Sequence, residues 1–127
     1  MSKKIHFSEK APKPIGPYSQ AVEANGFVFF AGQIPLDPAT GDVVKGGISD
    51  QAKRVLENIS AVLSAADLKF DNVVKSTIYL TDMNDFTAVN EVYGQYFKAN
   101  PPARTTIAVA ALPKAVKVEI EITACRK

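Results

Sequence analysis

Two charged residues near the carboxyl end of this 127-residue chain have the chemistry to act on a small carboxylic acid. Arg104 and Glu119 fall on adjacent strand-like segments, residues 104–111 and 117–125. A guanidinium holds a carboxylate through two parallel hydrogen bonds, and a glutamate beside the bound molecule can take a proton from water. Neither role requires a cofactor. The competing interpretation, the commoner one for an isolated arginine and glutamate, is a pair of ordinary cross-strand surface residues.

The length and composition of the chain indicate a single domain spanning residues 1–127. Its 46% hydrophobic content is typical of a water-soluble globular protein. The formal charge of +2 comes from 15 basic and 13 acidic residues scattered along the chain, without a basic stripe, so we expect no nucleic acid partner. No segment is long and apolar enough to cross a membrane, and no apolar run follows the basic N-terminus, so we expect a cytoplasmic protein.

The only cysteine and the only histidine give no sign of a redox or metal site. Cys125 has no second cysteine for an intrachain disulfide, and we interpret it as a packing residue at the end of a strand. His6 has no second ligand at a useful spacing, so we expect it to be solvated rather than bound to a metal.

The apolar pattern alternates between period two and period three to four, which predicts an α+β or α/β domain. Residues 18–23 and 27–34 resemble strands, and the Asn25-Gly26 pair between them predicts an antiparallel hairpin. A helix is predicted to begin with Ser49 as its N-cap. Its expected buried face consists of Ala52, Val55, Leu56, Ile59, Val62, Leu63 and Ala66.

Residues 72–80 are rich in β-branched side chains and predict a strand, followed by a second helix from residues 81–84 to about residue 99. The proline pair 101–102 ends this helix. Its expected buried side consists of Phe86, Val89, Tyr93, Tyr96 and Phe97. The final strand alternates strictly between apolar and polar residues, so Glu119 points away from the face on which the helices pack.

Two helices can cover only one face of a sheet with this many strands. In residues 27–34, large apolar side chains occupy both parities of the strand, so both of its faces should be buried. At roughly 25 cal/mol per Å² of apolar area, leaving two phenylalanine rings in water would forfeit several kcal/mol. We therefore predict an obligate oligomer with sites at its interfaces.

Five short motifs occur in order along the chain and together closely resemble the Rid family of reactive-intermediate deaminases. They are Gly16-Pro17-Tyr18-Ser19-Gln20-Ala21, Gly32-Gln33-Ile34-Pro35, Pro102-Ala103-Arg104, Leu112-Pro113-Lys114 and Val118-Glu119-Ile120-Glu121. The resemblance extends over nearly all the chain. It implies an α+β, chorismate-mutase-like fold with a mixed six-stranded sheet and two helices on one face, assembled as a homotrimer with clefts between subunits.

The same resemblance implies an activity, the hydrolysis of 2-imino acids such as 2-iminobutanoate and 2-iminopropanoate to 2-keto acids and ammonia. Such imines are released by pyridoxal-phosphate enzymes acting on serine or threonine. The resemblance assigns carboxylate binding to Arg104. Hydrolysis also needs a water aimed at the imine carbon, and we assign Glu119 to orient or deprotonate it. No cofactor or metal is expected for this chemistry.

Four further positions look like substrate contacts of the family. Gly32 and Thr106 resemble the positions whose backbone contacts the substrate nitrogen, Thr105 is grouped with them as a binding residue, and Tyr18 is expected to close the pocket with its hydroxyl. Each has a structural alternative: Tyr18 as a packing aromatic, Gly32 as a strand bulge and the threonines as ordinary strand residues.

Some positions weaken or limit the match. Phe86 and Asn90 resemble pocket-region positions of the family, but core packing and helix-surface roles explain them equally well, so they are left outside the predicted site. Thr106 stands where many relatives have cysteine, and Ala31 stands where serine is frequent. A thiol or serine nucleophile is thereby excluded at these positions, whereas attack by water needs no covalent intermediate.

Two other functions described for the family remain as alternatives, a translation-inhibiting endoribonuclease and a ligand-binding regulator. An acid-base ribonuclease benefits from paired histidines and a basic groove, and the chain has one histidine and no basic cluster. A regulator would keep Arg104 and the cleft but would not need Glu119. Substitution of Glu119 by glutamine therefore separates a binding module from an enzyme.

Overall fold

In the computed structural model, which describes residues 2–127, strands β2 (Ala21–Ala24) and β3 (Phe27–Phe30) pair antiparallel around a two-residue turn. Asn25 and Gly26 both have positive φ, 53° and 81°, which is the backbone of the turn that this residue pair favours. The predicted hairpin is confirmed. Both strands are shorter than predicted, because the regular ladder between β2 and β3 is confined to residues 21–30.

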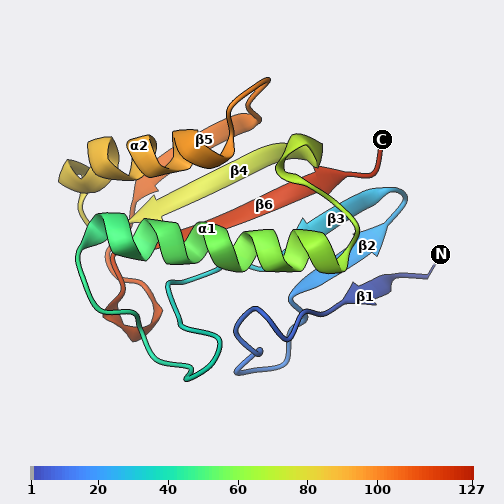
Figure 1. Cartoon of the computed structure of the whole chain (residues 1–127), viewed down its shortest axis with the longest axis horizontal. Coiled ribbons are helices and arrows are strands. Elements are labelled where there is room, and N and C mark those ends of the chain that lie inside the picture. The colour runs from blue at the N-terminus through green and yellow to red at the C-terminus, as the bar shows by residue number, and fades with distance from the viewer. Residues whose placement is uncertain (1) are drawn as a thin grey trace.

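The hairpin belongs to one six-stranded sheet in the order β1-β2-β3-β6-β4-β5 (Figure 1). The other strands are β1 (Lys4–His6), β4 (Val73–Leu80), β5 (Ala103–Ala108) and β6 (Val118–Cys125). All neighbours are antiparallel except β4 and β5, which are parallel. The mixed sheet agrees with the prediction, but β5 and β6 are not neighbours, since β4 lies between them. β1 was not predicted.

Helix α1 (Ile48–Ala65) packs its apolar face on the sheet. All seven residues predicted for that face are buried. The predicted cap at Ser49 is wrong, because Gly47 is the N-cap and Ser49 already lies inside the first turn. Asp50 reaches back and accepts a hydrogen bond from the Gly47 backbone at 3.1 Å, which satisfies one of the free N–H groups at the helix start.

Helix α2 (Phe86–Tyr96) follows a 3-10 turn (Met83–Asp85), whose start is capped by the Asp82 carboxylate accepting from the Asn84 backbone at 2.9 Å. It ends three residues earlier than predicted. Val89, Tyr93 and Phe97 are buried, as predicted, while the flanking aromatic rings at its two ends are half-buried against the core. Two further 3-10 turns span Phe70–Asn72 and Pro113–Ala115. No helix among residues 2–127 has both the length and the apolarity to cross a bilayer.

Both helices lie on the same side of the sheet (Figure 1), so the two faces differ sharply. In β6, Val118, Ile120, Ile122 and Ala124 face the helices and are buried, whereas the residues between them are half-buried. We call the second side of the sheet the open face. Phe27 and Phe29 lie there with 43% and 51% of their surface exposed. A single chain therefore leaves Phe27 and Phe29 of β3 partly uncovered, and burial of these rings by another copy stays a prediction.

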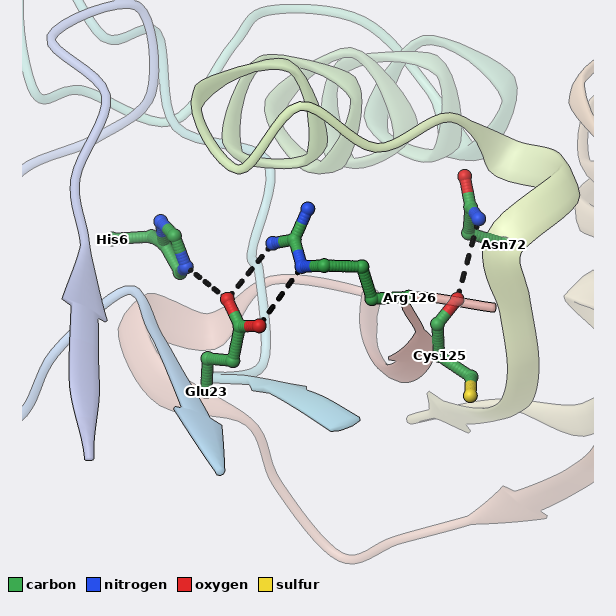
Figure 2. Close-up of polar contacts among 5 residues, drawn as sticks. All are labelled: His6, Glu23, Asn72, Cys125 and Arg126. Atoms are coloured by element: carbon green, nitrogen blue, oxygen red, sulfur yellow. Dashed lines mark hydrogen bonds and ion pairs between the residues drawn. The ribbon is translucent and has the colours of Figure 1, made fainter. Parts of the chain in front are cut away.

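Charged side chains tie the two ends of the chain together (Figure 2). Arg126 donates two hydrogen bonds of 2.8 Å to the Glu23 carboxylate, and the His6 ring contacts the same carboxylate at 2.8 Å. The expectation of a solvated His6 is wrong, because β1 places this ring in a buried position beside Glu23. Cys125 is half-exposed at the end of β6 rather than in the core, and its carbonyl accepts from Asn72 at 3.2 Å.

Candidate functional site

The guanidinium of Arg104 is held on several sides on edge strand β5. Its Nη1 donates to the Asn90 amide oxygen at 2.8 Å. Its central carbon lies 4.9 Å from the centre of the Tyr93 ring and 5.5 Å from that of Phe86, distances at which a cation is attracted to a ring face. Residues 2–127 supply no carboxylate partner within ion-pair distance. The cation is thus positioned but not neutralised.

A pair of buried hydroxyl groups fixes the Tyr93 ring that lies beside Arg104. Ser76 is the β4 residue that pairs with Arg104 across the parallel ladder. Its hydroxyl lies 2.6 Å from the Tyr93 hydroxyl, and both residues are buried. Burial raises the pKa of Tyr93, so its phenol remains neutral and can act as a donor. The ring beside Arg104 is therefore anchored to the strand next to it.

The two candidate threonines point to opposite faces. Thr106 shares the helix-covered face with Arg104, since its β4 partner is the core residue Ile78. Its Oγ1 is the one buried side-chain polar atom without a hydrogen-bond partner in the described part of the chain. Thr105 lies on the open face, where its hydroxyl accepts from Lys75 Nζ at 2.9 Å. Only Thr106 therefore shares a face with Arg104.

Glu119 lies on the open face, half-buried, as predicted from the alternation of β6. Burial, and then the charge of Glu121, raise the pKa of Glu119 above its usual value of 4.5. A carboxyl with a raised pKa is a stronger base than an ordinary surface carboxylate, which suits proton transfer from water.

Gly32 gives the Glu119 carboxylate its space. A Cβ added at Gly32 would lie 3.0 Å from Glu119 Cδ and closer still to Oε2. The backbone of Gly32 has no positive φ that would itself demand glycine. Within one chain, the missing side chain of Gly32 leaves room for Glu119, and the predicted contact of Gly32 with a substrate stays a prediction.

Tyr18 shares a small pocket with Gly32. Its ring is 50% exposed, and the pocket is also lined by Lys13, Ile15 and Gln33. Buried Gln20 fixes the preceding segment, since its amide donates to the carbonyls of residues 8 and 12 and its oxygen accepts from the backbone of residue 8. Tyr18 is thus carried by a tethered segment beside Gly32.

The candidate residues form two separate groups within one chain. Arg104 and Thr106 lie on the helix-covered side, whereas Glu119 lies on the open face beside Gly32. The strand register leaves no alternative, because Ile78 pairs with both Thr106 and Ile120, and Glu119 is the next residue to Ile120. A single chain does not bring the two charged groups together.

The sequence did not reveal all the residues that surround Arg104. Phe86 and Asn90 were left out, although both contact Arg104. Tyr93 was assigned to the core only, and Ser76 received no role. A stripe at positions 86, 90 and 93 of a helix is the available signal, since residues three and four apart share one helix side.

The candidate residues lie apart from the hollow beside α1, and the described part of the chain shows no cluster of metal ligands among them. In residues 2–127, no three His, Cys, Asp or Glu side chains gather closely enough to hold a metal ion. A surface hollow lies between residues 7–10 and α1, and none of the candidate residues lines it. Arg104 lines a separate shallow hollow with Tyr93 and residues 101–102.

Known proteins match this chain along most of its length. Residues 8–126 match the family model described as Endoribonuclease L-PSP. The human 2-iminobutanoate/2-iminopropanoate deaminase is 49% identical over 96% of this chain and 89% of the human protein. A structure from Yersinia pestis, described as a Rid-family protein of unknown function, is 46% identical, with a TM-score of 0.95 over 98% of this chain and 99% of that one. E. coli TdcF with bound serine is 45% identical, with a TM-score of 0.93 and the same coverage of both chains. The chain therefore belongs to the Rid family.

Proposed function

We propose that this chain, as one Rid-family domain, hydrolyses reactive 2-imino acids such as 2-iminobutanoate and 2-iminopropanoate to 2-keto acids and ammonia. The observation that carries the proposal is the guanidinium of Arg104, which Asn90 and two aromatic rings hold without an internal carboxylate partner. Such a cation suits a carboxylate brought by a small molecule. The name of the human relative agrees with this substrate class.

The proposed site lies between two copies of the chain in a homotrimer. Because the sheet separates Arg104 from Glu119 within one chain, a second copy has to supply one of the two groups. A copy that covers the open face would also bury Phe27 and Phe29. At roughly 25 cal/mol per Å² of apolar area, this burial supports assembly by several kcal/mol. Substrate binding by both groups would then require assembly of the subunits.

In the proposed reaction, Arg104 binds the substrate carboxylate and leaves the neighbouring C=N carbon open to attack. Glu119 takes a proton from water as the water oxygen bonds to this carbon, and the imine nitrogen gains a proton. The proton taken by Glu119 balances the one gained by the nitrogen. As the carbinolamine collapses, its hydroxyl proton is transferred to the amino group, the C–N bond breaks, a C=O bond forms, and ammonia leaves. One water is consumed for each 2-keto acid and ammonia produced.

Further contacts to the substrate are proposed for Tyr18, Gly32 and the two threonines. The unpartnered Thr106 hydroxyl supports a contact at that position, in addition to its backbone. Thr105 faces the other way, so its contribution in the same cleft is limited to its backbone. The half-exposed Tyr18 beside Gly32 supports a role in closing the pocket.

A ligand-binding role is the second candidate. The structure described for E. coli TdcF contains bound serine, which shows that a relative binds a small amino acid. A binding module needs Arg104 but has no use for a base. If the Glu119→Gln variant binds 2-ketobutyrate like the wild type but no longer hydrolyses imine, the enzyme is supported; if hydrolysis is unchanged, Glu119 has no part in the mechanism.

The direct test generates 2-iminobutanoate enzymatically and traps the remaining imine with semicarbazide. Loss of a charge-assisted contact of about 1.5–3 kcal/mol should reduce kcat/KM by roughly 10- to 150-fold in Arg104→Ala. Arg104→Lys should recover only part of this loss, because lysine cannot bind a carboxylate with two parallel bonds. Wild-type hydrolysis by Arg104→Ala would refute the proposed function.

A mixing experiment tests the location of the site. Arg104→Ala and Glu119→Gln chains, each strongly impaired alone, should regain activity when they are unfolded together and reassembled. If each site takes one residue from each of two copies, about a quarter of the sites in a random equal mixture contain both native groups. Activity that stays at the level of the separate variants would argue against a shared site.

A further inference from the structure

Two carboxylates lie on the open face two residues apart on β6, and their surroundings differ. Glu119 and Glu121 both point away from the helices. Two residues along a strand span roughly 6–7 Å, close enough for like charges to influence each other. Glu119 lies against Gly32, and no described residue donates a hydrogen bond to it. Glu121 has a donor, so the two carboxylates are not equivalent.

The donor to Glu121 is the hydroxyl of Tyr79 on β4. Tyr79 pairs with Glu119 across the ladder, yet its hydroxyl reaches the diagonal carboxylate instead. The bond to Glu121, followed by burial and the nearby carboxylates, raises the pKa of Tyr79 to about 12. The phenol therefore keeps its proton at neutral pH and serves only as a donor. The hydrogen bond holds the Glu121 carboxylate in place, whereas Glu119 has no such donor among residues 2–127.

We propose that Glu121, held by Tyr79, is a positioning residue whose fixed negative charge keeps the neighbouring Glu119 ready to accept a proton from water. This inference rests on the proposed function. Where two carboxylates share a site, unequal surroundings commonly divide their roles, and here Glu119 is assigned as the proton acceptor and Glu121 as the neighbouring carboxylate that a hydrogen bond holds in place. The rise in the pKa of Glu119 that Glu121 causes agrees with this division.

The other side chains on the open face near Glu119 are neutral or have partners of their own. On β4, Lys75 also faces the open side, but its ammonium donates to Thr105. The open-face residues of β3 are phenylalanines, and those of β5 are Ala103, Thr105 and Ile107, none of which carries a charge. Lys13 and Tyr18 line the pocket around Gly32. Lys117 lies two residues before Glu119, just outside β6. Among residues 2–127, Glu121 is the charged group that raises the pKa of Glu119.

The test is the pH profile of kcat/KM for enzymatically generated 2-iminobutanoate. In Glu121→Gln the like charge is gone, the pKa of Glu119 falls, and the acid limb should move to lower pH by about 0.5–1 unit. A weaker base should also lower kcat in the pH-independent region by about 3- to 10-fold, with KM changed less than twofold. Glu9→Gln, at an exposed carboxylate in the N-terminal segment, should leave the profile unchanged.

A second variant tests the part played by Tyr79. Tyr79→Phe removes the donor, so Glu121 is no longer fixed and kcat should fall. If Tyr79 acts only through Glu121, Tyr79→Phe/Glu121→Gln should match Glu121→Gln alone within about twofold, because the two effects are not additive. Independent, multiplying losses would overturn the assignment of Tyr79.

Binding of 2-ketobutyrate and the assembled mass of each variant show whether the site itself has survived. With both preserved, a wild-type acid limb in Glu121→Gln overturns this inference while leaving the proposed function intact, provided that Glu119→Gln is inactive. Full hydrolysis by Glu119→Gln would instead refute the proposed role of Glu119. If Glu121→Gln does not assemble, the pH profile of Tyr79→Phe decides, and an unchanged kcat and acid limb there also overturn the inference.

Discussion

At the scale of single residues, the absence of a side chain at Gly32 affects where the carboxylate of the proposed base, Glu119, can lie. Gly32 looked from the sequence like either a bulge or a point of substrate approach. Its missing side chain leaves room for the Glu119 carboxylate. The sequence could not reveal this contact, because it arises from a bridge between residues 33 and 120, which lie far apart along the chain.

Gly32→Ala should therefore separate activity from stability. The methyl group would collide with the end of a flexible side chain, so Glu119 can move aside and unfolding free energy should change by less than about 1 kcal/mol. The displaced base should lower kcat by roughly tenfold or more, since proton-transfer catalysis depends on position. Imine hydrolysis and thermal unfolding check the two parts. Gly94→Ala, where an added Cβ meets nothing within 4 Å, is the matched control.

Glu23 gives a residue-scale prediction about stability. Hydrogen bonds from Arg126 and His6 lower its pKa from 4.5 to about 2. Between these two values the unfolded chain binds more protons than the folded one, so the contribution of Glu23 is complete above pH 4.5 and is lost as the pH falls through 2. Glu23→Gln should lower the melting temperature at pH 7, and its difference from the wild type should shrink progressively below pH 4.5. A difference that is constant from pH 7 to pH 2 would contradict this account.

At the scale of elements, helix α2 has two functions. Val89 and Val92 serve the core, while Phe86, Asn90 and Tyr93 hold Arg104. Periodicity predicted the buried side of this helix but treated Tyr93 as core alone. The second function depends on β5 running parallel to β4, and a sequence pattern does not specify which strands become neighbours.

Two substitutions at Tyr93 should separate these functions. Tyr93→Phe keeps the ring beside Arg104 but leaves the buried Ser76 hydroxyl without its partner, so it should lower stability by about 1–2 kcal/mol with little change in KM. Tyr93→Leu removes the ring, and loss of a cation–π contact of about 0.5–2 kcal/mol should raise KM for imine roughly 2- to 30-fold. Urea unfolding and steady-state kinetics measure the two effects. Equal KM values for the two variants would exclude a role for the ring.

The elements themselves were largely predictable where local rules decide. The Asn25-Gly26 turn, the buried face of α1 and the strict alternation of β6 all follow from residue spacing. Strand β1 and the burial of His6 could not be predicted in this way. A strand of three residues is too short to show an apolar alternation, and the position of β1 depends on its pairing with β2. The start of α1 differs from the predicted start because Gly47, whose backbone donates to Asp50, is the N-cap.

At the scale of the whole molecule, the exposed rings of β3 predict assembly. Phe29→Asp places a charge in the middle of the open face, where roughly half of the native ring is exposed in one chain. If another copy covers this face, burial of an unpaired charge should split the assembly and abolish imine hydrolysis. Light scattering after size-exclusion chromatography gives the mass. Phe7→Asp, which changes an exposed ring beside α1, should keep both mass and activity.

In the proposed mechanism, the sheet that divides Arg104 from Glu119 also makes turnover depend on protein concentration. A solitary polypeptide would carry both proposed groups but could not apply them to one substrate molecule. Specific activity should then be constant at high protein concentration and decline upon dilution. After a concentrated sample is diluted, the activity should reach its lower value only after a lag, because the subunits must first dissociate. The midpoint of that decline would report the strength of subunit association through catalysis alone.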